Sequence, residues 1–367
     1  MPRTRPVFKT AAIDDQEKFK PLPQPTGVYP YHLDIQTVVA NLPKNKMVFH
    51  MAGDTGGLVF PEFKHRVANA MIEQWGQISI PDDQPQFLFH LGDVVYNYGQ
   101  EEEYYQQFFE PYRDYPNLVF ATPGNHDADL DPFDTRQRDS LEAFIKVFCD
   151  TRPNVIPFAG DTGRLSNVQP NVYWTLKTPL ANIIVLYSNI PRFGAISPEQ
   201  GEWFRRELLA ARTEDKALLV CLHHPAWSAD TNHGSSIHMQ RFFETAFRET
   251  GVYPDAVFSG HVHNYQRFTK RYDNGKAIPF IVAGAGGYAD LHRIALPGDP
   301  AFPDDSPLFN NVLLEKYCDT QHGFLKVSIQ KEAGKTILSG EYYVVDMLDN
   351  NQTGAALFDC FLVNIGA

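Results

Sequence analysis

The sequence predicts an α/β fold that forms one large domain. Short apolar runs with strand character alternate with helical segments from Lys46 onward. Five short polar blocks follow these runs or lie within them, as side chains at strand ends do, and they are spread over residues 54–263. A site assembled from both halves leaves no place for a domain boundary between them. We therefore expect an N-terminal arm over residues 1–44, rich in proline and polar residues, and a single domain over residues 45–367.

The first half of the domain is expected to alternate strands with helices. The predicted strands are residues 47–53, 87–91 and 118–122. Residues 61–77 predict a helix, because proline stands in the first turn and apolar residues recur on one face. The acidic, tyrosine-rich stretch 101–114 and residues 140–148 are also predicted to be helical.

The second half repeats this alternation. The predicted strands are residues 183–188, 217–222, 256–260 and 280–287. Ser197 begins a helix with the spacing of a capping box. The last segments alternate in the manner of an antiparallel sheet, and these are residues 323–330, 336–345 and 361–365. Residues 295–307 are rich in proline and aspartate and predict a long surface loop.

Composition limits the classes of function. The chain has 367 residues, of which 43% are hydrophobic, and a net charge of -12. General nucleic-acid binders are usually basic, so no nucleic-acid binding is expected, whereas bound cations can still let an acidic protein hold phosphate. The apolar runs are too short for a transmembrane helix, so no membrane partner is expected. The start, MPRTRPVFKTAAIDDQ, lacks the apolar segment of a signal peptide. We expect a cytoplasmic protein, or a secreted one only if its N-terminus is truncated.

The four cysteines are widely spaced and form no CxxC pair. Cys149, Cys221 and Cys360 lie in apolar runs and are predicted to be buried as small hydrophobic residues. A structural disulfide is disfavoured in a cytosolic chain.

The five polar blocks carry seven potential metal ligands. GDTGG contains Asp54, GDVVY contains Asp93 and Tyr96, GNHD contains Asn125, VCLHH contains His223, and GHVH contains His261 and His263. A single block of this kind has little meaning, but five in series are typical of a metal site. A two-metal site with an open face usually hydrolyses a phosphate ester.

The oxygen donors suit such a site. Glycines after Asp54 allow a tight turn that turns its carboxylate toward a metal, although a lone aspartate there is more often a turn cap. Asp93 has two carboxylate oxygens and can bridge two cations about 3.5–4 Å apart. Tyr96 would normally be a core or rim aromatic, but as a phenolate it suits a trivalent metal and so indicates Fe(III). Asn125 can offer its amide oxygen, or simply occupy a turn.

The histidines are the strongest single signals. Imidazole nitrogen is a good ligand for Zn, Fe and Mn. His261 and His263 are two residues apart, so in a strand both face the same side and can reach one site. A lone histidine beside a strand is more often a core residue, as we expect for His50 and His90. His224 should point away from His223 if that strand continues, which would place it behind the ligands or at the rim.

In this order, the GD, GDxxY, GNHD, VxxH and GHxH blocks resemble the calcineurin-like metallophosphoesterases, and Tyr96 resembles their purple acid phosphatase branch. The resemblance covers about residues 48–267 and is looser beyond. It implies a four-layer αββα sandwich with two mixed sheets and a binuclear metal centre at the strand ends. It also implies two ligand sets: Asp54, Asp93, Tyr96 and His263 for Fe(III), and Asp93, Asn125, His223 and His261 for Fe(II), Zn or Mn.

The resemblance also assigns residues to the substrate. His126 and His233 match substrate-facing histidines, and Asn125 is a further substrate contact. Asp127 either orients His126 or caps a turn. Arg267 either binds the substrate anion or pairs with one of the many carboxylates.

Two departures from the family pattern indicate a short, minimal form. Ala128 follows Asp127 in the region where animal-type members place a histidine. The residues before the first block are too few for the N-terminal β domain of the plant type. A reducing cytosol would also favour Fe(II), Mn or Zn over Fe(III).

The implied activity is metal-dependent hydrolysis of phosphate monoesters in a small phosphorylated substrate, in the manner of an acid phosphatase. A metal-activated hydroxide would attack phosphorus, and His126 or His233 would give a proton to the leaving group. A phosphodiesterase of the same fold is the first alternative, although such enzymes more often have Asp or Asn in place of Tyr96. An inactive binding or scaffold member is the second, although such members usually lose ligands. Oligomeric state is not predicted.

Overall fold

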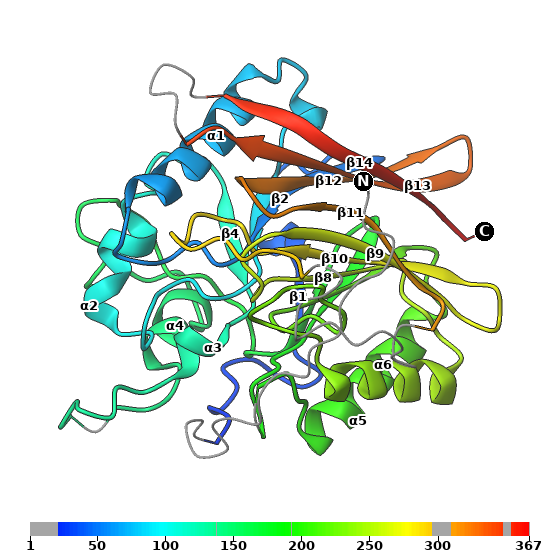
Figure 1. Ribbon diagram of the computed structural model, residues 1–367, viewed down its shortest axis with the longest axis horizontal. Coiled ribbons are helices and arrows are strands. Elements are labelled where there is room, and N and C mark those ends of the chain that lie inside the picture. Colours follow the sequence, from blue (N-terminus) through cyan, green and yellow to red (C-terminus); the bar gives the residue numbers. More distant parts are fainter. Residues whose placement is uncertain (1–20, 137, 192, 296–309, 348–353, 367) are drawn as a thin grey trace.

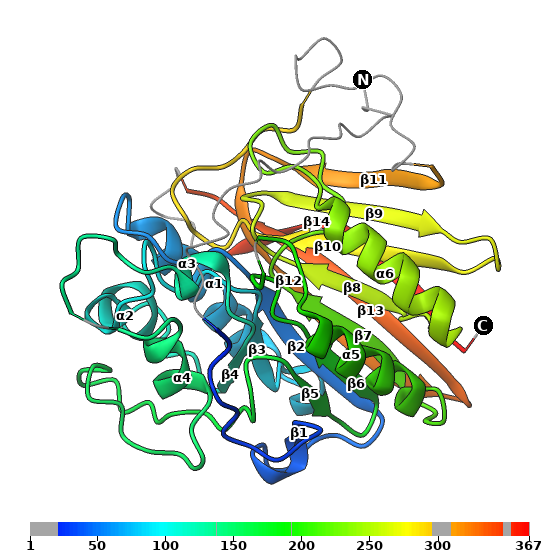
Figure 2. The ribbon, with the colours of Figure 1, turned by 90° about the horizontal axis from the view of Figure 1, so that it is seen from below.

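The computed structural model describes residues 21–136, 138–191, 193–295, 310–347 and 354–366. Within these ranges the chain folds into two mixed β-sheets packed face to face, with helices on both outer faces (Figures 1 and 2). The predicted α/β sandwich with two mixed sheets is therefore confirmed.

One sheet has six strands in the order β14-β13-β12-β2-β3-β4. Its strands are β2 (Lys46–Ala52), β3 (Phe87–His90), β4 (Leu118–Ala121), β12 (His322–Glu332), β13 (Lys335–Val345) and β14 (Ala355–Ile365). The strands β2, β3 and β4 are parallel to one another. The three C-terminal strands are antiparallel, as their alternating sequence predicted.

The other sheet has eight strands in the order β1-β5-β6-β7-β8-β10-β9-β11. Its strands are β1 (His32–Asp34), β5 (Trp174–Lys177), β6 (Ala181–Val185), β7 (Ala217–Leu222), β8 (Ala256–Ser259), β9 (Tyr265–Arg271), β10 (Ala277–Ala283) and β11 (Val312–Cys318). The strands β6, β7, β8 and β10 are parallel. The edge strand β1 comes from the region before residue 45 and pairs with β5, although its sequence gave no strand signal.

Helices cover the outer faces of both sheets. They are α1 (Glu62–Gln77), α2 (Glu101–Tyr104), α3 (Asn125–Ala128), α4 (Glu142–Phe148), α5 (Pro198–Ala211) and α6 (Ile237–Thr250). In Figure 1, α1 lies on the side of the six-stranded sheet, and α5 and α6 lie on the opposite side, below the eight-stranded sheet. Ser197 caps α5 by accepting a hydrogen bond from the Gln200 N–H, as its spacing predicted.

The core between the sheets follows from the two-residue period of the strands. Phe49 and Met51 of β2 and Leu219 of β7 are fully buried there, in one apolar cluster. Alternate residues of the same strands, such as Ala52 and Val220, face the helices instead. Burying each large apolar side chain contributes about 1.5–3 kcal/mol, so this double core fixes the register of both sheets.

Some predictions about the surface need correction or cannot be followed. The cysteines that the structure describes form no disulfide, and Cys149 and Cys221 are buried as predicted. Cys360 is exposed, because Phe361 and Val363 of β14 pack against the core and the alternation of a strand places Cys360 on the opposite face. The predicted surface loop lies almost wholly outside the described residues, which stop at residue 295 and resume at residue 310. Among the described residues, no helix has the length and hydropathy needed to cross a bilayer.

Candidate metal centre

The seven predicted ligands come together at the carboxyl ends of strands from both sheets. Each follows the end of a strand: β2, β3 and β4 in the six-stranded sheet, and β7 and β8 in the eight-stranded sheet. In open α/β sheets, the carboxyl ends of parallel strands are where ligands usually bind. The six-stranded sheet supplies only oxygen donors, which are Asp54, Asp93, Tyr96 and Asn125. The eight-stranded sheet supplies only imidazoles, which are His223, His261 and His263.

One group of donors surrounds the Tyr96 hydroxyl. Tyr96 Oη lies 3.3 Å from Asp54 Oδ1 and 3.2 Å from His263 Nε2. His263 Nε2 in turn lies 3.6 Å from Asp54 Oδ1. These three side chains are buried, so their donor atoms converge on a small space shielded from water.

A second group surrounds His223. Its Nε2 lies 3.1 Å from Asn125 Oδ1 and 3.3 Å from Asp93 Oδ2. The ring of His261 lies 5.1 Å from the His223 ring. Donor atoms of Asp54, Asp93 and His223 lie within 4.8 Å of one another, so the two groups are adjacent.

Hydrogen bonds fix which nitrogen of each histidine faces the centre. His223 Nδ1 lies 2.8 Å from the Leu91 carbonyl oxygen, and His263 Nδ1 lies 2.9 Å from the Asp290 carbonyl oxygen. A carbonyl can only accept, so each Nδ1 carries a proton and each Nε2 is the atom that faces the centre. His223 Nε2 then faces two oxygens that can only accept, so a second proton or a cation has to lie between these atoms. A cation between these atoms satisfies all of them, so the donor set fits a metal.

The electrostatics of the protein groups alone support the same conclusion. Burial, and then the negative charge of Asp93, raise the pKa of Asp54 well above its usual value. Burial lowers the pKa of His223, but the carboxylates of Asp93 and Asp54 outweigh it and raise that pKa to about 9. Burial, and then Asp93 and Asp54, raise the pKa of Tyr96 well above its ordinary value. Without a metal, the carboxylates thus hold a second proton on His223, and metal cations would replace that proton and supply more positive charge.

Three of the ligands have strained backbone conformations. The φ angles are +58° at Asp54, +55° at Asp93 and +67° at His261. Residues other than glycine rarely adopt this left-handed region, and those that do cluster at functional sites. At each of these residues the chain turns sharply after a strand, and the turn directs the ligand side chain into the centre.

Glycines precede these ligands because there is no room for a side chain. At Gly92, with φ +96°, a Cβ would lie 2.5 Å from His223 Nδ1. At Gly124, a Cβ would overlap the Asp93 carboxylate. The GD and GN pairs therefore follow from the close approach of neighbouring loops.

His126 and His233 both lie beside the centre. The His126 ring packs 4.2 Å from the Tyr96 ring, and its Nδ1 lies 2.9 Å from the Asn97 carbonyl oxygen. The His233 ring lies 4.4 Å from the His261 ring. Both are partly exposed, which leaves them accessible to a ligand.

The sequence leaves two roles open for Asp127 and for Arg267, and the contacts of each residue favour the second, a cap for Asp127 and an ion pair for Arg267. The Asp127 carboxylate accepts hydrogen bonds from the backbone N–H groups of Gly124, Val94 and Val95. It therefore fastens the GNHD loop to the GDVVY loop, and the Asn97 carbonyl holds the His126 ring instead. Arg267 forms a two-pronged ion pair with Asp359 on β14, with Nε 2.8 Å from Oδ2 and Nη2 3.1 Å from Oδ1. It is engaged in the sheet rather than free to bind substrate.

The condition on which the His224 prediction depended, that the strand continues, is not met, and His224 lies beside the ligands. Its ring lies 4.3 Å from the His261 ring, and its Nδ1 lies 2.8 Å from Ser188 Oγ. The strand β7 ends at Leu222, so the alternation of faces no longer applies at the next two residues. His50 and His90 are buried as expected, and His90 Nε2 lies 2.8 Å from the Thr55 hydroxyl beside the GDTGG turn.

Sequence reasoning missed several neighbours of the ligands. The Tyr288 ring stacks 4.2 Å from the Tyr96 ring, and the His292 ring stacks 4.3 Å from the His263 ring. Gln107 accepts from the Tyr96 N–H and donates to the Tyr96 carbonyl. The glycine-rich run before Tyr288 was noted only as a strand, and no signal in it marked these contacts.

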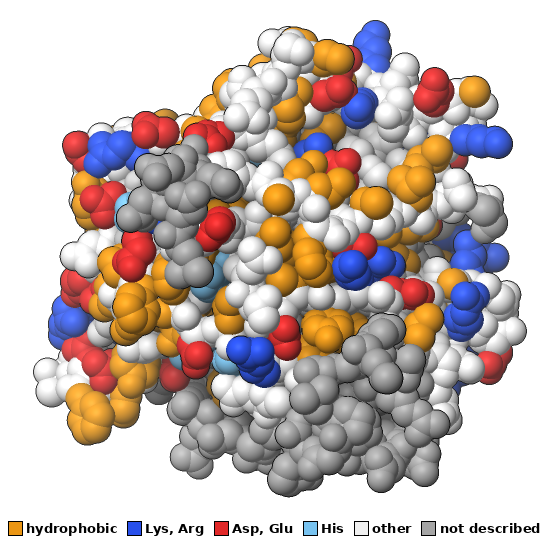
Figure 3. Space-filling model, turned by 45° about the horizontal axis from the view of Figure 1, so that its top comes forward, with side chains coloured by type: hydrophobic (Ala, Val, Ile, Leu, Met, Phe, Trp, Pro, Cys, Tyr) orange, Lys and Arg blue, Asp and Glu red, His pale blue; other side chains and the backbone are white. Residues whose placement is uncertain are grey.

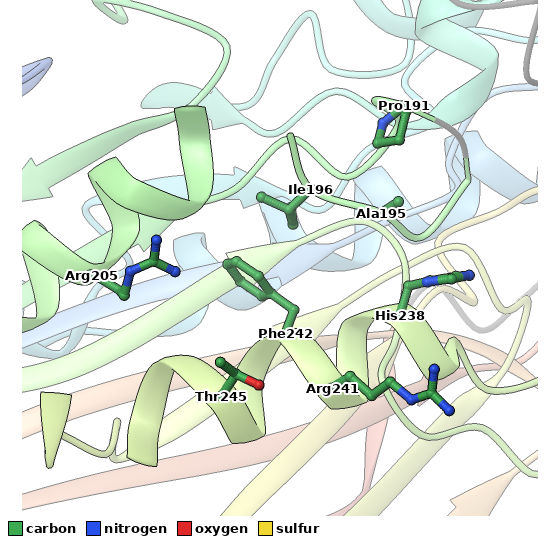
Figure 4. Close-up of a pocket in the computed structure, with 8 residues that line it drawn as sticks. All are labelled: Pro191, Ala195, Ile196, Arg205, His238, Arg241, Phe242 and Thr245. Carbon is green, nitrogen blue, oxygen red and sulfur yellow. The ribbon is translucent and has the colours of Figure 1, made fainter. Parts of the chain in front are cut away.

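A surface pocket of about 700 Å³ lies apart from this donor set. In Figure 4 its lining comes from α5, α6 and the loop that carries Pro191 and Ile196. It contains none of the predicted ligands, and its Arg205 is paired with Glu202 at 2.9 Å. The pocket therefore adds nothing to the metal centre.

Comparisons with known proteins agree with the geometry. Residues 47–265 match the calcineurin-like phosphoesterase family. Purple acid phosphatase 18 of Arabidopsis thaliana is 28% identical over 218 residues, which are 56% of this chain and 45% of that protein. Fe(3+)-Zn(2+) purple acid phosphatase 12 of the same plant is 29% identical over 150 residues, which are 40% of this chain and 28% of that protein. The chain spans less than half the length of these relatives, which imply a dimetal centre.

A solved structure supports the fold. The GAP50 anchor of the inner membrane complex of Plasmodium superposes with a TM-score of 0.57 at 12% identity. The superposition covers 88% of this chain and 90% of that one. With the family match spanning more than half of the sequence, the chain belongs to the calcineurin-like phosphoesterase family, and within it resembles the purple acid phosphatases.

Proposed function

We propose that this protein hydrolyses phosphate monoesters with the aid of two bound metal ions. The observation that carries the proposal is the Tyr96 hydroxyl, which lies beside both Asp54 Oδ1 and His263 Nε2. A phenol among metal ligands distinguishes the purple acid phosphatase pattern from other phosphoesterases of this fold. The purple acid phosphatases among the relatives support the same reading.

The residues fit two different cations. Asp54, Tyr96 and His263 form a hard, partly anionic set that suits Fe(III). Asn125, His223 and His261 form a more neutral set that suits Fe(II), Zn or Mn, and Asp93 lies between the two sets. When bound, the pair of cations would supply positive charge for the phosphate oxygens and would make an attacking water more acidic.

The protein itself would position the substrate and move a proton. The Asn97 carbonyl holds His126 Nδ1, so His126 Nε2 is free to face a phosphate oxygen or a leaving group. His233 stands beside the second set of ligands and is assigned the same task. The Asn125 amide, 3.1 Å from His223, is close enough to the centre to contact substrate as well.

A small phosphorylated molecule is the proposed substrate. On the face seen in Figure 3, Lys and Arg side chains are scattered among Asp and Glu and form no continuous basic surface. A polyanion would need such a surface, whereas a single phosphate can be held by the cations themselves.

The test compares p-nitrophenyl phosphate with bis-p-nitrophenyl phosphate at equal metal loading. We expect the monoester to be turned over at least about tenfold faster, a difference of about 1.4 kcal/mol in barrier height. Preference for the diester would favour the phosphodiesterase alternative. Absence of both activities in a protein that holds two metals would favour an inactive binding member. Asp93→Asn serves as the control for contaminating phosphatases.

A further inference from the structure

Asp230 and His292 form a buried pair beside the metal centre, and the proposed mechanism gives them no task. Asp230 has no exposed surface, and His292 is 6% exposed. His292 Nδ1 lies 3.2 Å from Asp230 Oδ2. Burying a carboxylate is unfavourable unless hydrogen bonds or a paired group compensate it, and the contacts of Asp230 supply both.

Asp230 organises the loop that carries His233. Its Oδ2 accepts hydrogen bonds from the backbone N–H groups of Asn232, at 3.1 Å, and His233, at 2.5 Å. The Ser228 hydroxyl donates to the His233 carbonyl at 2.9 Å, and the Asp230 N–H donates to the same hydroxyl oxygen. The backbone on both sides of the His233 side chain is thus held by short-range bonds, and most of them converge on Asp230.

His292 connects this loop to a metal ligand. Its ring stacks on the His263 ring at 4.3 Å and lies 4.8 Å from the His233 ring. The backbone N–H of His292 donates to the His263 carbonyl oxygen at 3.0 Å. The Asn232 side-chain amide donates to His292 Nε2 at 3.2 Å, which leaves the proton on Nδ1, the nitrogen that faces Asp230.

The two loops are also joined along their backbones. Thr231 N–H donates to the Arg293 carbonyl at 2.9 Å, and Ala295 N–H donates to the Ala229 carbonyl at 3.0 Å. Asp230 and Ile294 form a β-bridge between these bonds. His233 therefore sits on a loop that is fastened to the segment supporting His263.

We propose that Asp230 and His292 are positioning residues that hold His233 at a set distance from the metal ligand His263. The inference rests on the proposed function, because it takes His233 to face the substrate. A histidine on a partly exposed loop would otherwise sample several positions, and only some of them would place its nitrogen near the phosphate. Neither residue is expected to touch substrate.

The test is a double-mutant cycle with p-nitrophenyl phosphate. Asp230→Ala should lower kcat by about 10–100-fold while the protein retains its metals, as is usual for residues that orient others. In a His233→Ala background the same change should lower kcat by less than about threefold, because it acts through His233. Equal losses in both backgrounds, or no loss in the first, would overturn the proposal.

A matched control and a second readout keep the outcomes distinct. Asp255→Ala also removes a carboxylate, here half-buried, that accepts from a backbone N–H, that of Leu218. Asp255 precedes β8, at the opposite end of that strand from the ligand His261. It should leave kcat within about twofold. Amide hydrogen exchange at Asn232 and His233 should accelerate in Asp230→Ala and stay unchanged in Asp255→Ala, whatever the activity.

Two further results separate the possible failures. If Asp230→Ala does not fold, His292→Gln takes its place in the cycle with the same expected coupling. If the metal-loaded wild-type protein hydrolyses no monoester, the proposed function fails. Unchanged hydrogen exchange in Asp230→Ala would then contradict the positioning role on its own.

Discussion

The two sheets contribute to the metal centre in different ways. The six-stranded sheet presents oxygen donors on tight, strained turns, with left-handed backbone at Asp54 and Asp93. The eight-stranded sheet presents imidazoles, and two of these, His223 and His263, are oriented by carbonyls that accept from Nδ1. Left-handed backbone thus occurs at two ligands of the oxygen half and, in the nitrogen half, at His261, whereas hydrogen bonds to carbonyls orient only the other two imidazoles.

Each half also depends on the other. The His223 proton is held by the carbonyl of Leu91, which follows β3 in the opposite sheet. The Asp54 carboxylate accepts from the N–H of His261 at 2.8 Å, again across the two sheets. Because of these contacts between the sheets, a substitution in the loops of either sheet is expected to displace ligands on the other.

The largest expected effect comes from the ligand between the two groups. Asp93→Asn should lower kcat by more than about 100-fold, beyond the usual effect of a residue that only orients ligands, and should reduce the content of both metals. His261→Ala, which removes one imidazole from the nitrogen half, should leave about one metal per chain. Elemental analysis checks both. Equal metal content in the two variants would argue against a shared position for Asp93.

A glycine substitution tests whether the oxygen half is held by close packing. Gly92→Ala would place a Cβ 2.5 Å from His223 Nδ1 at a φ of +96°. Gly251→Ala has a similar backbone, with φ +66°, but meets nothing within 4 Å. The control should cost about 1–2 kcal/mol of unfolding free energy, from backbone strain alone. Gly92→Ala should cost more and also release metal, as urea unfolding with elemental analysis would show.

His50 lies in the six-stranded sheet and is not a predicted ligand, so it tests whether a buried imidazole of that sheet affects stability without affecting metal binding. Burial lowers the pKa of His50 to about 3, although the hydrogen bond that His50 Nε2 donates to Gln74 Oε1 opposes this. The folded pKa lies below the unfolded value of about 6.5, so the unfolded chain binds more protons and stability falls as the pH drops from about 6.5 toward 3. His50→Gln should reduce this loss by about 1–3 kcal/mol between pH 7 and pH 4. Urea unfolding at several pH values checks this. An equal dependence of unfolding free energy on pH in the wild type and the variant would contradict the prediction, and metal content should not change.

The smallest expected effect concerns Tyr96. If Fe(III) is bound, Tyr96→Phe should abolish a visible absorption band of the tyrosinate while kcat falls less than about tenfold, because the other ligands remain. Phenylalanine keeps the ring between His126 and Tyr288. Persistence of the band would mean that another group is its source. If the wild-type protein is colourless and contains Mn or Zn, those metals would be assigned to the centre in place of Fe(III).

The local parts of this picture could be predicted from sequence. The GD, GN and GH blocks identified Asp54, Asp93, Asn125 and His261, because a glycine, a sharp turn and a polar side chain after an apolar strand are all adjacent in the chain. The alternation of strands and helices followed for the same reason, since their periodicities are local properties, whereas the two-sheet sandwich was implied by the family resemblance.

The parts that depend on distant contacts could not be predicted. Nothing near Arg267 indicates that Asp359, on the last strand, would pair with it. The face of His224 could not be predicted because it depends on where β7 ends. Asp230 and His292 stand 62 positions apart, and only the folded loops bring them within 3.2 Å. The edge strand β1 is three residues long, too short to show a period.

The most direct test is the number of metal ions bound to the purified protein and to two variants, each of which removes one ligand from one of the two sheets. Elemental analysis should find two metal ions per chain, and fewer in both Asp54→Ala and His263→Ala, together with loss of p-nitrophenyl phosphate hydrolysis. This result would establish that oxygen donors from one sheet and imidazoles from the other form a single working centre. Full activity with unchanged metal content in either variant would contradict it.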